Sequence, residues 1–110
     1  MQVKKTYLNH IVLISFKEGA DDEVRQEISA RYTTLGEDCG GKSAGILYWS
    51  VQPNIDTRKG IHLVEIAFFK DLASYENFKK HPKHLEVVEL LKNSADWYVG
   101  DIIEVLPKID

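Results

Sequence analysis

Residues 74–84 read Ser-Tyr-Glu-Asn-Phe-Lys-Lys-His-Pro-Lys-His, and this stretch divides the second helical region of the chain into two helices. Proline fixes its own backbone φ and is favoured in the first turn of a helix. Pro82 therefore predicts that one short helix ends near residue 80 and that another begins directly after it. The junction carries His81 and His84, and histidine is the side chain that titrates near neutral pH.

Strand and helix patterns alternate on both sides of this junction. Residues 7–16 alternate as a strand does, Gly19 ends that strand, and Asp21 or Asp22 caps a helix that runs to about residue 38. The order of the elements is β-α-β-β-α-α-β, which predicts an α+β fold with a ferredoxin-like antiparallel sheet and helices on one face. The other predicted elements are strands at about 44–52, 61–69 and 97–106, a polar loop at 54–60, a helix that Asp71 caps and that reaches about residue 80, and a helix that reaches about residue 93.

The composition limits the classes of partner. We expect a single domain over residues 1–110, with its core at about 7–106, because 110 residues are the length of one domain. The net charge of -3 offers no basic surface for nucleic acid or anionic lipid, and no apolar stretch approaches the length of a membrane span. Cys39 is the only cysteine, so no internal disulfide can form, and we expect a reducing compartment and a cytoplasmic protein.

The later strands are apolar on both faces. A sheet with one solvated face should alternate apolar and polar residues, but 61–69 and 97–106 do not alternate cleanly. Helices can cover one face only, so the second face needs a partner, and another copy of the same sheet is the simplest one. We therefore expect a homodimer through the sheet face. The alternative is a monomer whose second face is covered by the chain ends.

The positions of three histidines suggest a site between the sheet and the helices. His10 and His62 share the parity of the more uniformly apolar residues on their strands, and His84 begins the helix that should cover that face. Burial would lower the pKa of these rings and favour the neutral form that suits a general base. The predicted ligand-binding residues around them are Val12, Ile14, Tyr32, Val64, Tyr75, Phe78 and His81.

Each of these residues also has a structural interpretation. A histidine in a strand is often a hydrogen-bonded core residue, and His81 stands where a helix N-cap would stand. Three histidines could bind zinc, but the chain lacks the paired His and Cys spacing on one element that zinc sites show, so we predict no metal. We also predict no cofactor, because Gly40-Gly41 follows a helix and cannot cradle phosphate at a helix N-terminus.

Four segments together resemble the stress-responsive A/B barrel family, also called the Dabb domain. They are residues 10–17 (HIVLISFK), 60–68 (GIHLVEIAF), 75–84 with the HPxH motif, and 99–105 (VGDIIEV), so the resemblance covers about residues 10–105. The resemblance implies a dimeric α+β barrel made of ferredoxin-like subunits. The well-understood enzymes of the family resemble the plant polyketide cyclase that makes olivetolic acid, and most members have no known activity.

The resemblance also implies roles for particular residues. The second histidine of HPxH acts as the base in that cyclase, which makes His84 the candidate base, with His10 and His62 as the matching strand histidines. A tyrosine six residues before the base assists in the cyclase, but this chain has Phe78 there, and phenylalanine has no hydroxyl. Tyr75 lies one helical turn earlier and could point into the same pocket from a different height.

Three functions stay open at this stage. The first is a dimer that binds a small apolar or aromatic molecule between sheet and helices, without an assignable reaction. The second is a cofactor-free enzyme on a polyketide-like or phenolic substrate, in which His84 abstracts a proton alpha to a carbonyl and His10 or His62 stabilises the enolate. The third is a non-catalytic, stress-related structural protein. Phe78 favours the first of these.

Overall fold

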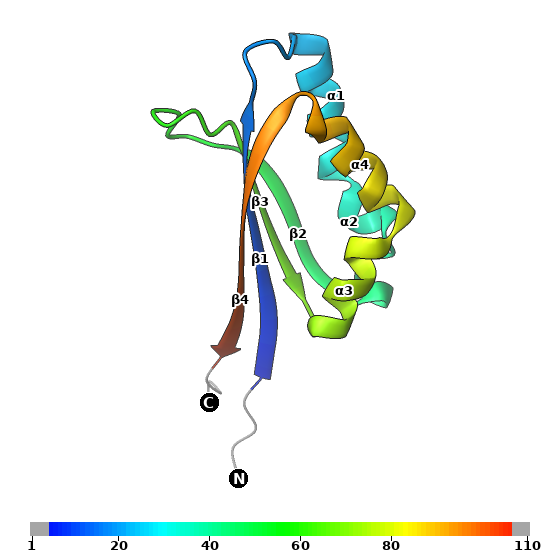
Figure 1. Ribbon diagram of the computed structural model, residues 1–110. Helices are drawn as coiled ribbons and strands as arrows, with labels where there is room; N and C mark the ends of the chain where they lie inside the picture. Colours follow the sequence, from blue (N-terminus) through cyan, green and yellow to red (C-terminus); the bar gives the residue numbers. More distant parts are fainter. Residues whose placement is uncertain (1–4, 107–110) are drawn as a thin grey trace.

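The computed structural model describes residues 5–106, which form one antiparallel sheet and one layer of helices (Figure 1). The strands are β1 (Lys5–Phe16), β2 (Ile46–Pro53), β3 (Leu63–Phe69) and β4 (Ala95–Leu106). The helices are α1 (Asp22–Thr33), α2 (Leu35–Asp38), α3 (Leu72–Lys80) and α4 (Pro82–Lys92), with the short 3-10 helix η1 (Gly41–Ala44) before β2. The two ends of the predicted domain, 1–4 and 107–110, lie outside the described residues.

The sheet has the strand order β2-β3-β1-β4, and every neighbouring pair is antiparallel. Figure 1 shows the helices on one face of this sheet and no helix on the other. The element order and the single helical layer confirm the predicted ferredoxin-like α+β fold.

The alternation in β1 decides which side chains the helices cover. Leu8, Val12 and Ile14 are 4%, 3% and 0% exposed, whereas the odd-numbered residues between them are only half-buried. Successive side chains of a strand point to opposite faces, so His10 lies on the helix-covered face with the even-numbered residues. The prediction for His10 is confirmed, because its exposed fraction is 5%.

The predicted faces of β3 are wrong. The register pairs Ile14 with Leu63 and His10 with Ala67, so the odd-numbered residues of β3 share the helix-covered face. Val64 therefore points to the uncovered face, although it was expected beneath the helices. A shift of one residue moves every side chain of a strand to the other face. Both faces of β3 are largely apolar, and the odd-numbered face carries Glu65, so composition alone favoured the wrong face.

The first helical region contains two helices, where one was predicted. Asp21 is the N-cap of α1, and its side chain accepts a hydrogen bond from the Val24 N–H at 2.9 Å. At the break after Thr33, the carbonyl of Tyr32 accepts the indole N–H of Trp49 at 3.0 Å and the backbone N–H of Thr34. The shorter helix α2 then continues to Asp38.

The junction between α3 and α4 has the predicted form. Asp71 caps α3 by accepting the backbone N–H of Ser74 at 2.8 Å. His81 ends α3 and is also the N-cap of α4, where its Nδ1 accepts the Lys83 N–H at 3.1 Å. Pro82 occupies the first position of α4, where the missing N–H costs nothing. The structural interpretation of His81 is confirmed.

The helical spacing of Leu85, Val88 and Leu91 or Leu90 predicts the buried face of α4, and the observed face differs from it by a small rotation. Val87 and Leu91 are 4% and 3% exposed, but Leu85 is 51% exposed. His84 begins the inward face, and residues three, four and seven positions later follow it at helical spacing. Leu85 lies one residue beyond that face and therefore points to solvent.

The face of the sheet away from the helices, called the open face below, is largely apolar. Ile66 of β3 is 39% exposed there, and Tyr98 and Ile102 of β4 are 59% and 49% exposed. Soluble proteins seldom leave a continuous apolar face of this kind uncovered. By register and alternation, the apolar side chains of the open face are those of Ile11, Leu13, Tyr48, Val64, Ile66, Phe68, Tyr98 and Ile102.

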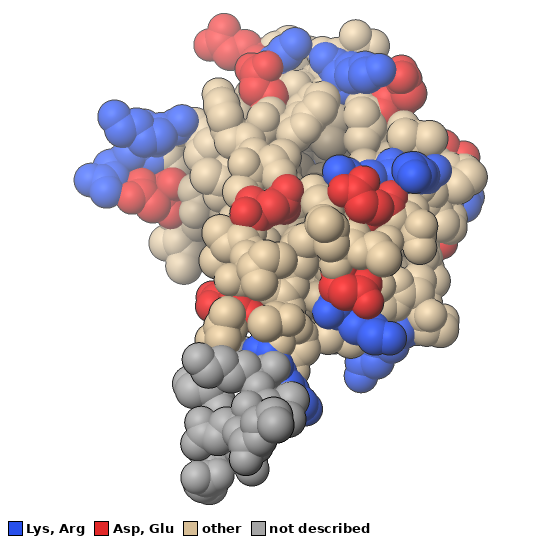
Figure 2. Space-filling model, turned by 60° about the horizontal axis from the view of Figure 1, so that its bottom comes forward, with Lys and Arg blue, Asp and Glu red and all other residues tan. Residues whose placement is uncertain are grey.

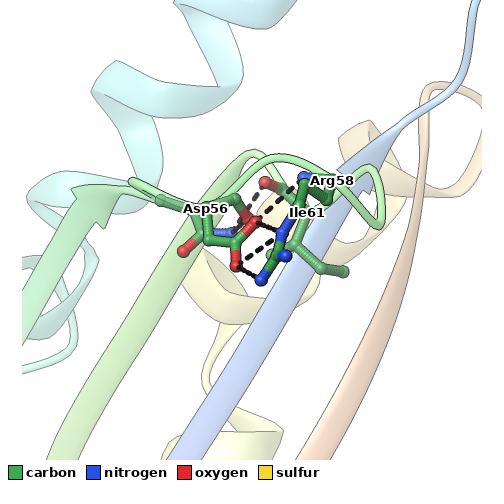
Figure 3. A network of polar contacts seen from close by, with 4 residues as sticks. Asp56, Arg58 and Ile61 are labelled. Carbon is green, nitrogen blue, oxygen red and sulfur yellow. Dashed lines mark hydrogen bonds and ion pairs between the residues drawn. The ribbon is translucent and has the colours of Figure 1, made fainter.

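The β2–β3 loop extends to the same side of the sheet as the open face (Figure 1). Figure 3 shows how local hydrogen bonds fix its shape. Nδ2 of Asn54 donates to the carbonyls of Asp56 and Ile61, and Arg58 binds the Asp56 carboxylate through Nε at 2.9 Å and Nη2 at 2.7 Å. These bonds confirm the polar loop and present Ile55, whose side chain is fully exposed.

Charged groups of both signs are interspersed on the face that Figure 2 shows, with uncharged residues between them. Ion pairs on the helices contribute to this mixture, for example Lys79 with Glu76 at 3.1 Å. No helix within the described range of the chain has the length and apolar character of a membrane span.

Candidate functional site

His10 occupies the centre of the space between the sheet and the helices. It lies on β1, one of the two central strands of the sheet, and alternation directs its ring toward the helices. The ring packs among three aromatic rings, with centroid distances of 5.0 Å to Tyr75, 6.1 Å to Phe69 and 6.3 Å to Phe78. Burial in these surroundings lowers the pKa of His10, against the opposing influence of Asp101.

Asp101 joins His10 to Tyr75. The register of β1 and β4 places Asp101 directly opposite His10, and its Oδ1 lies 2.5 Å from Nδ1 of the ring. The other oxygen, Oδ2, accepts the hydroxyl of Tyr75 at 2.8 Å. A carboxylate oxygen only accepts, so Nδ1–H of His10 and the hydroxyl of Tyr75 both donate to Asp101. Asp101 is the solvent end of this group, since 34% of its side chain is exposed.

Glu65 joins His10 to Tyr32 on the other side. Glu65 is 1% exposed and lies opposite Val12, one position along the helix-covered face from His10. Its Oε1 accepts the Tyr32 hydroxyl at 2.8 Å, and its Oε2 lies 3.4 Å from Nε2 of His10 without accepting a hydrogen bond. Burial raises the pKa of Glu65 to about 8, which favours the protonated carboxyl at neutral pH.

His84 reaches the same space from the first turn of α4. Its ring packs on Phe78 with a centroid distance of 4.5 Å, and its Nδ1 lies 3.1 Å from the carbonyl oxygen of Lys79. A carbonyl only accepts, so Nδ1 carries the proton, and in the neutral ring Nε2 has a free lone pair. Burial lowers the pKa of His84 and favours this neutral form.

These side chains border a cavity of about 200 Å³ between the sheet and the helices. Six of the predicted site residues line it together, namely His10, Val12, Tyr32, Tyr75, Phe78 and His84. Its apolar wall comes mainly from α4 and β4, and the residues there are Val87, Val88, Leu91, Trp97 and Val99. The arrangement can hold an apolar molecule beside a set of hydrogen-bonding groups.

His62 does not reach this cavity, which corrects the prediction that three histidines converge. It lies just before β3, where its N–H donates to the Ile14 carbonyl at 2.8 Å and its Nδ1 accepts the Phe16 N–H at 3.0 Å. This position is beside the last residues of β1, beyond Ile14 along the strand from His10. His62 closes the end of the β1–β3 ladder, so it is the hydrogen-bonded structural residue of the alternative interpretation.

Three more predicted ligand-binding residues lie away from the cavity. Ile14 is fully buried and belongs to the core, one position along its face from Val12. Val64 points to the open face because of the β3 register. His81 caps α4 and borders a separate small depression beside Cys39 and Ser74.

The sequence interpretation missed Glu65 and Asp101, the two carboxyl groups on either side of His10. A single acidic residue within an apolar strand is a signal for a buried, hydrogen-bonded carboxyl, since unpaired charges are costly to bury. Asp101 could be linked to His10 only through the register of two strands far apart in the sequence. Within residues 5–106 no group of three or more His, Cys, Asp or Glu side chains has the arrangement of a metal site.

The fold and the site together define a ferredoxin-like α+β protein with a cavity bordered by histidine and tyrosine beneath its helices. The family model of the stress responsive A/B barrel domain, Dabb, matches residues 8–104. The chain belongs to this family.

Several solved structures share the fold of this chain. A Dabb family protein with a ferredoxin-like fold from Mesorhizobium loti is 15% identical, with a TM-score of 0.71 over 94% of this chain and 100% of that one. A hydroxynitrile lyase from Passiflora edulis is 16% identical, with a TM-score of 0.71 over 94% and 96%. A dimeric ferredoxin-like protein of unknown function from Jannaschia is 23% identical, with a TM-score of 0.69 over 87% and 97%. Among curated protein sequences, none matches this chain.

Proposed function

We propose that the protein binds a small molecule, about the size of one substituted aromatic ring, in the cavity between the sheet and the helices. The volume of about 200 Å³ carries this proposal. A dry cavity of roughly 150 Å³ holds benzene, whereas drug-sized ligands occupy roughly 300–1,000 Å³. A single ring with a short substituent therefore fits, and a long polyketide chain does not.

The lining favours a flat, largely apolar ligand. Phe78 and Trp97 supply aromatic faces, and aliphatic side chains of α4 supply most of the rest. Hydrogen-bonding groups gather at one end, around His10 and His84, where they can orient a polar substituent. This combination of an apolar wall with a few convergent polar groups is typical of small-molecule sites.

Titration with phenol, followed by amide chemical shifts, tests the proposal. We expect shifts at the cavity residues and saturation of the signal in the wild-type protein. Val88→Trp should abolish the response, because Val88 lines the cavity and is only half-buried, so the larger side chain can enter the cavity. Leu85→Trp is the matched control on the same helix, because Leu85 is exposed and should leave binding intact. The absence of saturable shifts with phenol and similar single-ring compounds would contradict the proposal.

A homodimer through the open face forms part of this proposed function. The apolar side chains of that face and the fully exposed Ile55 of the adjoining loop support it. The similar proteins from Bacteroides fragilis, Thermobifida fusca and Jannaschia are described as dimeric. Two sheets packed face to face would bury both apolar surfaces at once.

A cofactor-free proton-transfer enzyme is the second candidate, with His84 as the base. The observation in its favour is the hydrogen bond from Nδ1 to the Lys79 carbonyl, which leaves Nε2 available to take a proton in the cavity. The hydroxynitrile lyase of similar fold is itself an enzyme. Against a polyketide cyclase stand the cavity volume and Phe78, and Tyr75 donates its hydroxyl to Asp101. If neither binding nor turnover is found, the structural role is the remaining candidate.

A further inference from the structure

The hydroxyl groups at the polar end of the cavity donate their protons within the chain. The hydroxyl of Tyr75 donates to Asp101 and that of Tyr32 donates to Glu65, each at 2.8 Å. Each acceptor is a carboxyl group held by the sheet. Neither tyrosine can therefore donate to a ligand without giving up its hydrogen bond to a carboxyl group.

His10 has both ring nitrogens next to the same two carboxyl groups. Nδ1 lies 2.5 Å from Asp101 and Nε2 lies 3.4 Å from Glu65. Because Nδ1–H of His10 donates to Asp101, Nε2 of the neutral ring carries a lone pair and no proton. His10 is therefore not a free donor toward the cavity.

His84 is different, because its free nitrogen is an acceptor. The Lys79 carbonyl takes the Nδ1 proton, and Nε2 of the neutral ring has a lone pair without a hydrogen bond to the described part of the chain. The ring lies on Phe78, which also borders the cavity, so a ligand packed on Phe78 would meet His84 at once.

Two other donors line the cavity, and the positive charge of one of them, Lys79, acts on both His10 and His84. The ammonium group of Lys79 is paired with Glu76 at 3.1 Å, lies 4.8 Å from the Tyr75 ring centroid and is 43% exposed. Trp97 is four residues from Asp101 along β4, about 13 Å at the rise of an extended strand. Apart from the ammonium group of Lys79, which is paired with Glu76, the polar end near His84 therefore presents acceptors.

We propose that the cavity selects ligands that bring their own hydrogen-bond donor, a phenol or alcohol hydroxyl that donates to Nε2 of His84. This inference rests on the proposed small-molecule function and specifies the chemical class of its ligand. A carbonyl or ether oxygen at the same place would face acceptor groups and would lose its hydrogen bonds with water without replacement. For this reason, a binding site that hydrogen-bonds a polar group of its ligand binds analogues without that group much more weakly.

Three single-ring compounds separate the possible outcomes. Benzyl alcohol and benzaldehyde have the same carbon skeleton, but the alcohol carries a hydrogen-bond donor and the aldehyde carries only an acceptor. Toluene has neither group. We expect benzyl alcohol to bind about tenfold more tightly than benzaldehyde, because one hydrogen bond of about 1.4 kcal/mol is a factor of ten. Benzaldehyde should bind no more tightly than toluene. Dissociation constants come from the same chemical-shift titration.

Variants of His84 complete the test. His84→Phe keeps an aromatic ring on Phe78 and should remove the preference for the alcohol while toluene still binds. His84→Leu serves the same purpose if the larger ring impairs folding. Equal or tighter binding of benzaldehyde, or an unchanged preference in both variants, would overturn this inference alone. If none of the three compounds binds the wild-type protein, the proposed function fails and the inference fails with it.

Discussion

Nε2 of His10 lies 3.4 Å from Oε2 of Glu65, and both side chains are almost completely buried. The two groups come from neighbouring strands and are one position apart along the helix-covered face. Burial lowers the pKa of His10 and raises that of Glu65 to about 8, so both are favoured in their neutral forms near pH 7. The His10–Glu65 pair at the polar centre of the protein is therefore favoured in its uncharged form near pH 7, with the carboxyl protonated.

Glu65 should make the stability of the protein depend on pH. In the folded state the carboxyl keeps its proton up to about pH 8, whereas an unfolded chain loses it near the ordinary glutamate pKa. The folded state then binds more protons between about pH 5 and 8, so the free energy of unfolding falls as pH rises, by at most about 1.4 kcal/mol per pH unit. Urea unfolding of the wild type and of Glu65→Gln measures this dependence. The variant should show a flatter profile, because Gln does not titrate. Parallel profiles would show that Glu65 is ionised at neutral pH.

Removal of the Tyr32 hydroxyl should destabilise the fold. Tyr32→Phe leaves Oε1 of Glu65 buried without its donor, which costs about 1–3 kcal/mol. Tyr98→Phe is the control, because Tyr98 is 59% exposed and should change the stability very little. In the double variant with Glu65→Leu, the added Tyr32→Phe change should cost less than it does alone. Fully additive losses would mean that the hydroxyl and the carboxyl do not interact.

A charge on the open face should separate the proposed dimer. Ile66 lies on β3 with its side chain on that face, and a buried lysine there would lack a partner. Sedimentation equilibrium should give the mass of two chains for the wild type and of one chain for Ile66→Lys. Leu85→Lys, on the helical layer, should stay dimeric. A wild type that sediments as a single chain at micromolar concentration would exclude the dimer.

Substitutions of the two histidines of the HPxH motif should have different effects on stability and on ligand binding. His81→Ala removes the N-cap of α4 and should lower the free energy of unfolding by about 1 kcal/mol, with little effect on ligand binding. His84→Phe should weaken the binding of hydroxyl-bearing ligands and have a smaller effect on stability. Thermal unfolding together with the titration measures both properties. A loss of binding in His81→Ala equal to that in His84→Phe would contradict this division of roles.

The sequence was sufficient where a local pattern decided the structure. Pro82 predicted the α3–α4 junction, and the alternation in β1 predicted that His10 is buried. The pattern failed in β3, because apolar residues occur on both faces and only the pairing with β1 determines which face is covered. That error placed His62 and Val64 in the site and left Glu65 out of it.

The partners of His10 could not be obtained from local patterns at all. Asp101 is 91 residues from His10 in the sequence, and the two meet only through the β1–β4 register. Tyr75 was expected to approach the pocket at a different height from Phe78, and the structure shows that its hydroxyl belongs to Asp101. Contacts between distant strands thus determine which polar groups remain available to a ligand.

We expect a ring-sized ligand to occupy the cavity beneath α4 with its polar group at His84. A crystal structure of the protein soaked with phenol tests this expectation. It should show a ring packed against Phe78 and a phenol oxygen within hydrogen-bond distance of Nε2 of His84. Side chains that close the cavity in the crystal, or phenol bound only on the open face, would contradict it.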